Sequence, residues 1–223
     1  TVAIKPRPAA MGEWTHARQG PERPNTGDDL LLGPPRQLRW IDGPRRSTYH
    51  QGAPTAAVSA GGRFFCIANG AMPFMAVPPQ VRLEARDAFN GLLLWSKPLQ
   101  GKIPDAGTLV ASADRVYAVL SGDGPAVCLD AASGEVVRTY EGTRPTELML
   151  AAGLLMLVEG GGVRALDTSS GAIMWSAKAE GRVAAEAHRV PLFSAGRGTG
   201  HRAGFGIDRD VEPAVDRLAV REP

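Results

Sequence analysis

Short apolar runs separated by glycine and polar residues dominate the chain, and long amphipathic stretches are missing. In residues 84–95, the segment "EARDAFNG" is followed directly by the apolar run "LLLW". A helix would need an apolar stripe with a period of 3.6 residues, whereas an Asn-Gly pair between two strand-like runs is typical of a hairpin turn. The pattern therefore predicts strands joined by tight turns.

This pattern occurs three times, at intervals of about 40 residues. The copies read "ARDAFNGLLLW" from residue 85, "CLDAASGEVVR" from residue 128 and "ALDTSSGAIMW" from residue 165. An aspartate can accept a hydrogen bond from the backbone N–H two residues on, and a glycine takes a positive φ at little cost. We therefore predict the same capped turn in every copy. The structural repeat positions are Ala85, Asp87, Asn90 and Gly91, then Asp130 and Gly134, then Ala165, Asp167 and Gly171.

A second turn-like element precedes each copy. Residues 59–68, 111–120 and 151–160 each read as an apolar run, a short turn and another apolar run. Each repeat therefore predicts two hairpins, which together make a four-stranded antiparallel sheet, and such sheets repeated along a chain are the blades of a β-propeller. The predicted fold class is all-β: an incomplete β-propeller of WD40-like blades, with three clear copies.

The blades are predicted to occupy residues 38–178, beginning with a strand at 38–41 and including a long loop at 69–80. Residues 1–37 are rich in proline, glycine and charge, which indicates an irregular N-terminal arm. Residues 179–223 have two interpretations. In the first, they are a degenerate fourth blade in which Glu212 stands in place of the repeat glycine. In the second, they are an irregular tail.

Eight positions after the repeat aspartate, the first and third copies have Trp95 and Trp175, whereas the second has Arg138. An indole ring at this position would fill space between neighbouring blades. Arginine can cover the same surface only with its aliphatic stem while its head stays in solvent. We therefore expect a weaker contact after the second blade.

Composition argues against several classes of function. The 25 basic and 23 acidic residues nearly balance, which is not typical of a nucleic-acid-binding protein. The longest apolar run is shorter than the roughly 20 residues needed to span a bilayer, so no membrane span is predicted. Cys66 and Cys128 lie in separate apolar runs, and we expect both to be buried and unpaired. The chain has neither a G-x-S-x-G motif nor a phosphate-binding loop.

The pattern A-x-D-x-x-[TNS]-G-x-x-x-W resembles the tryptophan-docking repeat of the PQQ-like β-propellers. The copies that end at Trp95 and Trp175 match it in full, and the copy from residue 128 departs from it at Arg138. The resemblance extends over residues 38–178. It specifies the fold better than the function, because the matching residues are structural ones.

This resemblance implies one of two functions. The favoured one is a non-enzymatic binding or scaffold module that recognises a protein or small ligand through its blade-end loops. The alternative is a fragment of a PQQ-dependent quinoprotein oxidoreductase, with PQQ and calcium as cofactors, although the adjacent cysteine pair of those enzymes is missing. The resemblance also implies a periplasmic or exported protein. Further propeller blades or another chain are expected partners, because open strand edges promote association.

One loop combines residue types that hold anions or carbohydrates. We predict a candidate ligand site there, formed by Arg45, Arg46, Tyr49 and His50, with a solvated turn as the alternative. For the cluster of Trp14, Thr15 and His16, an aromatic anchor that pins the N-terminal arm is favoured over a binding site. The repeat aspartates are expected to cap turns rather than to act as catalytic carboxylates, because each belongs to a different blade.

Overall fold

The computed structural model describes residues 8, 10–22, 25–31, 40–43, 54–69 and 80–178, which all belong to one compact unit (Thr1–Ala185). These residues form three antiparallel sheets of four strands each, together with a turn of 3-10 helix, η2 (Ala106–Thr108). None of the described ranges contains a helix long and apolar enough to cross a membrane. The predicted all-β class and the three four-stranded blades are confirmed.

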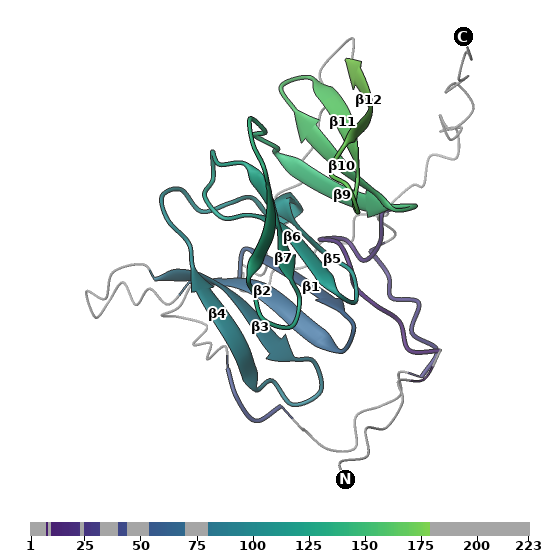
Figure 1. Ribbon diagram of the computed structural model, residues 1–223. Coiled ribbons are helices and arrows are strands. Elements are labelled where there is room, and N and C mark those ends of the chain that lie inside the picture. Colours follow the sequence, from purple (N-terminus) through teal and green to yellow (C-terminus); the bar gives the residue numbers. More distant parts are fainter. Residues whose placement is uncertain are drawn as a thin grey trace, which may run out of the picture. The chain divides into compact units, whose positions relative to one another are not determined.

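Each sheet is formed by strands that follow one another along the chain (Figure 1). The first sheet consists of β1 (Ala56–Ala60), β2 (Arg63–Asn69), β3 (Val81–Asp87) and β4 (Leu93–Pro98). The second consists of β5 (Leu109–Ala111), β6 (Arg115–Val119), β7 (Ala126–Asp130) and β8 (Val136–Tyr140). The third consists of β9 (Glu147–Ala151), β10 (Leu154–Glu159), β11 (Gly162–Asp167) and β12 (Ile173–Lys178). Within the described residues, the three sheets do not close into a ring.

Two apolar clusters pack the sheets against one another. The innermost strands are neighbours, because β1 contacts β5 and β5 contacts β9. The cluster between the first and second sheets includes Phe65, Ile67, Leu83, Leu109 and Leu129, and the cluster between the second and third includes Tyr117, Leu148, Leu155 and Leu157. Complete burial of a large apolar side chain stabilises a fold by roughly 1.5–3 kcal/mol. Contacts between blades therefore stabilise the protein in addition to strand pairing within each blade.

The outermost strand of each sheet contains a β-bulge at the same place. Leu94 is an extra residue between two cross-strand pairs of β4, and Val137 and Met174 are its counterparts in β8 and β12. Bulges disrupt strand pairing and increase the local twist. The free edges of these strands are therefore poor templates for the addition of another strand.

Several sequence predictions concern residues outside the described ranges, namely the loop at 70–79, the tail at 179–223 and parts of the arm. The predicted domain boundaries therefore stay predictions. The strand predicted at 38–41 is not present at Trp40 and Ile41. The Ile41 N–H instead donates to the carbonyl of Asn90 in the β3–β4 turn (2.8 Å). A single hydrogen bond to a turn does not extend the sheet to these two residues.

Candidate functional site

Each blade has two turns that lie side by side at one end. In every blade, an N–H group in the turn after the third strand donates to a carbonyl in the turn after the first. The pairs, each 3.0 Å apart, are Ala88 with Gly62, Ala131 with Asp114, and Thr168 with Gly153. This contact recurs in all three described blades, and we take this turn end as the candidate functional site.

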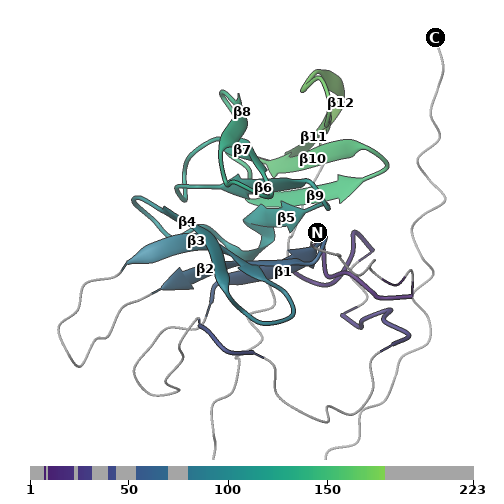
Figure 2. The same ribbon diagram turned by 60° about the horizontal axis from the view of Figure 1, so that its bottom comes forward.

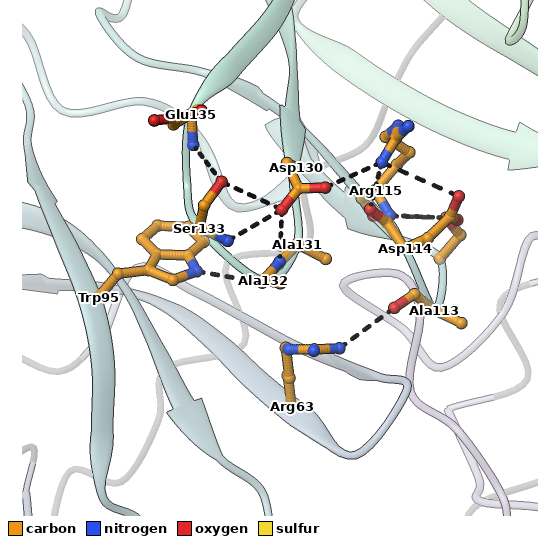
Figure 3. Close-up of polar contacts among 11 residues, drawn as sticks. Arg63, Trp95, Ala113, Asp114, Arg115, Asp130, Ala131, Ala132, Ser133 and Glu135 are labelled. Atoms are coloured by element: carbon orange, nitrogen blue, oxygen red, sulfur yellow. Dashed lines mark hydrogen bonds and ion pairs between the residues drawn. The ribbon is translucent and has the colours of Figure 1, made fainter.

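The repeat aspartates cap the second of these turns. The Oδ1 atom of Asp130 accepts hydrogen bonds from the N–H groups of Ala132 (3.0 Å) and Ser133 (2.9 Å) and from the Ser133 hydroxyl (3.1 Å), as Figure 3 shows. Asp87 and Asp167 accept the equivalent backbone hydrogen bonds in their own blades. The predicted capped turn is therefore present in all three copies. Each of these aspartates is engaged in its own turn.

The environment of two of these aspartates favours the charged carboxylate. The Ser133 N–H lowers the pKa of Asp130 below the ordinary value of 3.8, and Arg115 contributes to the same effect. The Ser169 hydroxyl makes the largest contribution to lowering the pKa of Asp167. Arg115 also forms an ion pair with Asp130 at 3.1 Å (Figure 3). A general acid needs a raised carboxyl pKa, so neither aspartate is suited to that role.

The glycine of each turn leaves room for a side chain from the preceding segment. Gly91, Gly134 and Gly171 have φ values of 79°, 73° and 76°, in the region that favours glycine. A methyl group on Gly134 would lie 2.6 Å from the Trp95 indole. The Nε1–H group of this indole donates to the carbonyl of Ala131 (3.0 Å; Figure 3). Trp95 of the first blade thus lies directly over the turn of the second.

Arginine occupies the equivalent place at the next turn. A methyl group on Gly171 would lie 2.5 Å from Nη1 of Arg138. The guanidinium of Arg138 donates through Nη2 to the carbonyl of Ser169 (3.1 Å). The head of Arg138 is therefore solvent-exposed, as the sequence led us to expect, and it also forms a hydrogen bond to the third blade that the sequence did not indicate. The flexible arginine side chain forms this bond because it reaches across the turn, whereas an indole ring packs on the turn.

Trp40 belongs to the same series, and the sequence reasoning missed it. A methyl group on Gly91 would lie 2.4 Å from the Trp40 ring. The repeat pattern did not indicate Trp40 because Leu32, and not an aspartate, stands eight positions before it. At the other end of the series, Trp175 is 44% exposed, and no repeat glycine lies under it among the described residues.

The N-terminal arm is hydrogen-bonded to the innermost strands of all three sheets. The bonds join Trp14 to Ser59 of β1 (3.1 and 2.6 Å), Thr15 to Ala111 of β5 (3.0 Å) and His16 to Leu150 of β9 (2.9 Å). The His16 ring is buried, and its Nε2 accepts the Leu150 N–H, so its proton lies on Nδ1, beside the Thr15 hydroxyl (2.7 Å). The cluster anchors the arm as predicted, and the bonds come from the backbone of Trp14 and Thr15 and from the His16 ring. Its reach across three sheets was not foreseen.

Arg86 supports the turn of the first blade from within the protein. Its buried guanidinium pairs with Glu84 (2.8 Å) and Asp42 (3.2 Å) and donates to the Gly91 carbonyl (2.9 Å). Leucines occupy this position in the other two blades, so the repeat pattern did not indicate an ion pair. Removal of one partner from a buried ion pair typically costs about 3–5 kcal/mol. Arg86 therefore has a structural role specific to the first blade.

Apolar side chains are exposed directly after the capped turns, on the outermost strands and, at Leu92, just before one. They are about half exposed and comprise Leu92, Leu93 and Leu94 in the first blade, Val136 and Val137 in the second, and Ile173, Met174 and Trp175 in the third. Figure 2 shows β12, which carries the last of these groups, as the final strand of the third sheet. Grouped exposed apolar residues commonly mark surfaces that bind other proteins.

The candidate ligand residues Arg45, Arg46, Tyr49 and His50 lie outside the described residues, so this site stays a prediction. Cys66 and Cys128 are buried and unpaired, as predicted. Burial raises the pKa of the Cys66 thiol to about 12, which makes it a poor nucleophile or metal ligand at neutral pH. In the part of the chain that the structure describes, no three histidine, cysteine or acidic side chains gather to hold a metal ion.

Comparison with known proteins gives one family and several solved structures. Residues 80–203 match the family model described as "Outer membrane protein assembly factor BamB". BamB from Moraxella catarrhalis is 21% identical over 77% of this chain and 46% of its own, with a TM-score of 0.46. Quinohemoprotein alcohol dehydrogenase from Comamonas testosteroni is 19% identical over 58% of this chain and 21% of its own, with a TM-score of 0.42. A europium-containing methanol dehydrogenase is 15% identical over 76% of this chain and 32% of its own, with a TM-score of 0.47.

The chain is thus shorter than these structures, and spans less than half of the length of each. No curated protein matches it.

Proposed function

The chain belongs to the family of outer membrane protein assembly factor BamB, whose model it matches over more than half of its length, and from this premise we propose that it is a non-enzymatic scaffold that binds a protein partner. The predicted PQQ-like repeat is confirmed by the same match. The proposed partner is a protein of outer-membrane assembly, and the proposed location is the periplasm.

The observation that carries this proposal is the apolar surface repeated on β4, β8 and β12. Three blades expose apolar side chains at equivalent positions directly after a blade-end turn. The bulges on these strands disfavour recognition by strand addition, so we propose recognition through side chains. The capped turns hold these side chains in place, because a hydrogen-bonded turn limits the conformations of the residues that follow it. The capped turns that precede these strands would complete the surface.

The described residues do not fit a quinone and calcium site. Cys66 lies in β2 and Cys128 in β7, in different sheets, so the two thiols cannot form an adjacent pair beneath a quinone. Oxygen ligands for calcium are carboxylates and carbonyls, and the repeat aspartates are engaged in turns of separate blades. We therefore derive no reaction step through PQQ. The oxidoreductase alternative becomes an outcome of the experiment below.

A deletion and complementation experiment tests the scaffold proposal in the cells of origin. Deletion of the gene is expected to lower the amounts of outer-membrane proteins, and the wild-type chain should restore them. The double variant Leu94→Asp and Val137→Asp should fail to restore them, because it places charge in the exposed apolar surface. Leu30→Asp is the matched control, because Leu30 is 83% exposed in the N-terminal arm and lies on no outer strand.

Unchanged outer-membrane protein levels after deletion would contradict the proposal, and so would full restoration by the double variant. A separate assay tests the alternative function. Purified protein supplied with PQQ and calcium would be mixed with an alcohol or sugar and a redox dye. Reduction of the dye would support an oxidoreductase and contradict the scaffold proposal.

A further inference from the structure

One row of side chains differs in kind among the three blades. The row crosses the second, third and fourth strands, where the strand register sets three residues side by side. Its members are Phe65, Ala85 and Trp95 in the first sheet, Tyr117, Cys128 and Arg138 in the second, and Met156, Ala165 and Trp175 in the third. The row is mainly apolar in the first and third sheets. In the second sheet all three members carry groups that form hydrogen bonds.

A cavity of about 540 Å³ lies beside the row of the second sheet. Its lining includes Tyr117, Cys128, Arg138 and Tyr140 from the second sheet and Thr168 and Ser169 from the turn of the third. Binding sites for small molecules commonly have volumes of about 300–1,000 Å³. At the preceding interface, the indole of Trp95 packs 6.0 Å from the Phe65 ring, measured between centroids. Because Arg138 replaces this indole with a narrow chain, space remains between the second and third blades.

The hydroxyl of Tyr140 lacks a partner in this lining. Tyr140 is 5% exposed, and its hydroxyl oxygen is buried without a hydrogen-bond partner among the described residues. Burial raises the Tyr140 pKa, and the nearby Arg138 guanidinium opposes this rise. The distance and angle between the two groups do not make a hydrogen bond of ordinary geometry. Buried polar groups are normally hydrogen-bonded. An unpartnered hydroxyl next to a cavity is therefore available to a ligand.

Arg138 is the second polar group available to a ligand. Within the described residues, no carboxylate lies within 4.0 Å of its guanidinium, which donates to the Ser169 carbonyl only through Nη2. Arg115, at the same cavity, is already paired with Asp130 (3.1 Å) and lies 4.0 Å from Asp114. A guanidinium offers five N–H donors in a planar fork. Arg138 therefore retains donors for an anion.

We propose that this cavity binds a small aromatic carboxylate. The carboxylate accepts hydrogen bonds from the Arg138 guanidinium and the Tyr140 hydroxyl. The flat apolar part of the ligand lies against Tyr117 and Leu150, in the space left open beside the narrow Arg138 side chain. This inference goes beyond the proposed scaffold function and does not depend on it.

Calorimetric titration of the full chain tests the proposal with three probes that share one ring. Indole-3-acetate carries the carboxylate, 3-methylindole has no charge, and tryptamine carries a positive charge. Indole-3-acetate is expected to bind at least about tenfold more tightly than the other two, because charge-assisted hydrogen bonds are the strong ones. N-acetyltryptophan resembles the carboxyl-terminal residue of a peptide. Its affinity, compared with that of indole-3-acetate, shows whether the cavity prefers a free acid or the end of a peptide chain.

Three variants test separately how the space in the cavity, the charge of Arg138 and the hydroxyl of Tyr140 contribute to binding. Arg138→Trp restores the residue of the other two blades and should abolish binding by filling the cavity, while the protein stays folded. Arg138→Met keeps much of the stem without the charge and should weaken indole-3-acetate at least about tenfold. Tyr140→Phe removes the unpartnered hydroxyl and should weaken binding about threefold to tenfold. Arg82→Met is the matched control, because Arg82 is exposed on β3 and does not line the cavity.

Thermal unfolding of each variant would show which ones are folded, so that a loss of binding is interpreted only for a folded protein. Equal binding of indole-3-acetate and 3-methylindole would overturn the anion site. Retained binding in a folded Arg138→Trp variant would overturn the cavity as its location. Absence of binding by the folded wild-type chain, with every probe at millimolar concentration, would overturn the whole inference.

Discussion

The interface between the first and second blades and the interface between the second and third have the same kind of capped turn, and they differ in the side chain that lies over its glycine. Both place a positive-φ glycine under the residue eight positions after the preceding aspartate. At the first interface this residue is Trp95, whose ring packs on Gly134 and bonds to Ala131. At the second it is Arg138, which bonds to Ser169 next to a cavity.

This difference separates two properties of the repeat. The capped turn and its positive-φ glycine are common to both interfaces. The side chain above the glycine decides whether the interface is filled. A ring excludes water and contributes apolar contact, whereas a guanidinium contributes directed hydrogen bonds and leaves space. The same scaffold can therefore form a packed interface or a hollow one.

The largest expected effect is a difference in the free energy of unfolding between substitutions at the two interfaces. Trp95→Ala should lower the free energy of unfolding by about 3–5 kcal/mol, the usual cost of truncating a large aromatic residue in a packed site. Arg138→Ala should lower it by about 1 kcal/mol or less, because a hydrogen bond that is exposed to solvent contributes little. Urea unfolding of both variants measures the difference. Equal midpoints would show that Trp95 does not dock the second blade.

A smaller effect is expected when the glycines themselves are changed. Gly134→Ala should cost roughly 2–4 kcal/mol, because it combines a left-handed backbone with a rigid ring 2.6 Å away. Gly171→Ala should cost roughly 1–2 kcal/mol, mostly from the backbone, because the end of Arg138 can move aside. The two variants are compared by thermal unfolding. A larger loss at Gly171 would contradict the view that the second interface is the looser one.

The smallest effect concerns pH. The folded-state pKa values of Asp130 and Asp167 are lowered, so their contribution to stability is complete above the ordinary value of 3.8 and is lost as the pH falls through the folded-state values. Ser169→Ala should raise the pKa of Asp167 and leave that of Asp130 unchanged. Carboxyl NMR titration of wild type and variant measures both groups in one sample. A shift of both aspartates would mean that the turns of different blades are coupled.

Much of the fold could be predicted because its signals are local. An aspartate, a glycine four positions later and an apolar run lie within one turn and the strand after it, so their spacing in the sequence survives folding unchanged. The turn caps at Asp87, Asp130 and Asp167 and the burial of both cysteines depend on such short-range features. The strand expected at 38–41 was wrong at Trp40 and Ile41, because strand formation also needs a partner strand.

The contacts that the sequence did not indicate are long-range. His16 reaches Leu150 across 134 positions, and Arg86 pairs with Asp42 across 44. Neither partner belongs to a repeated pattern, so no periodicity points to it. The candidate cavity is a similar case, since it needs residues from two blades and the absence of a ring at Arg138. Pattern reasoning identified this position as a departure from the repeat and interpreted it as a weak contact.

The sequence by itself determined the repeat, the strand order within each blade, the capped turns and the places where the repeat changes. These follow from backbone preferences and hydrogen bonds over a few residues. Only the tertiary structure decided which side chain lies on which glycine, how the arm joins three sheets, and where a cavity and exposed apolar strands lie. These depend on the packing of blades, and packing is set by the volumes and donors of residues that are distant in sequence and adjacent in space.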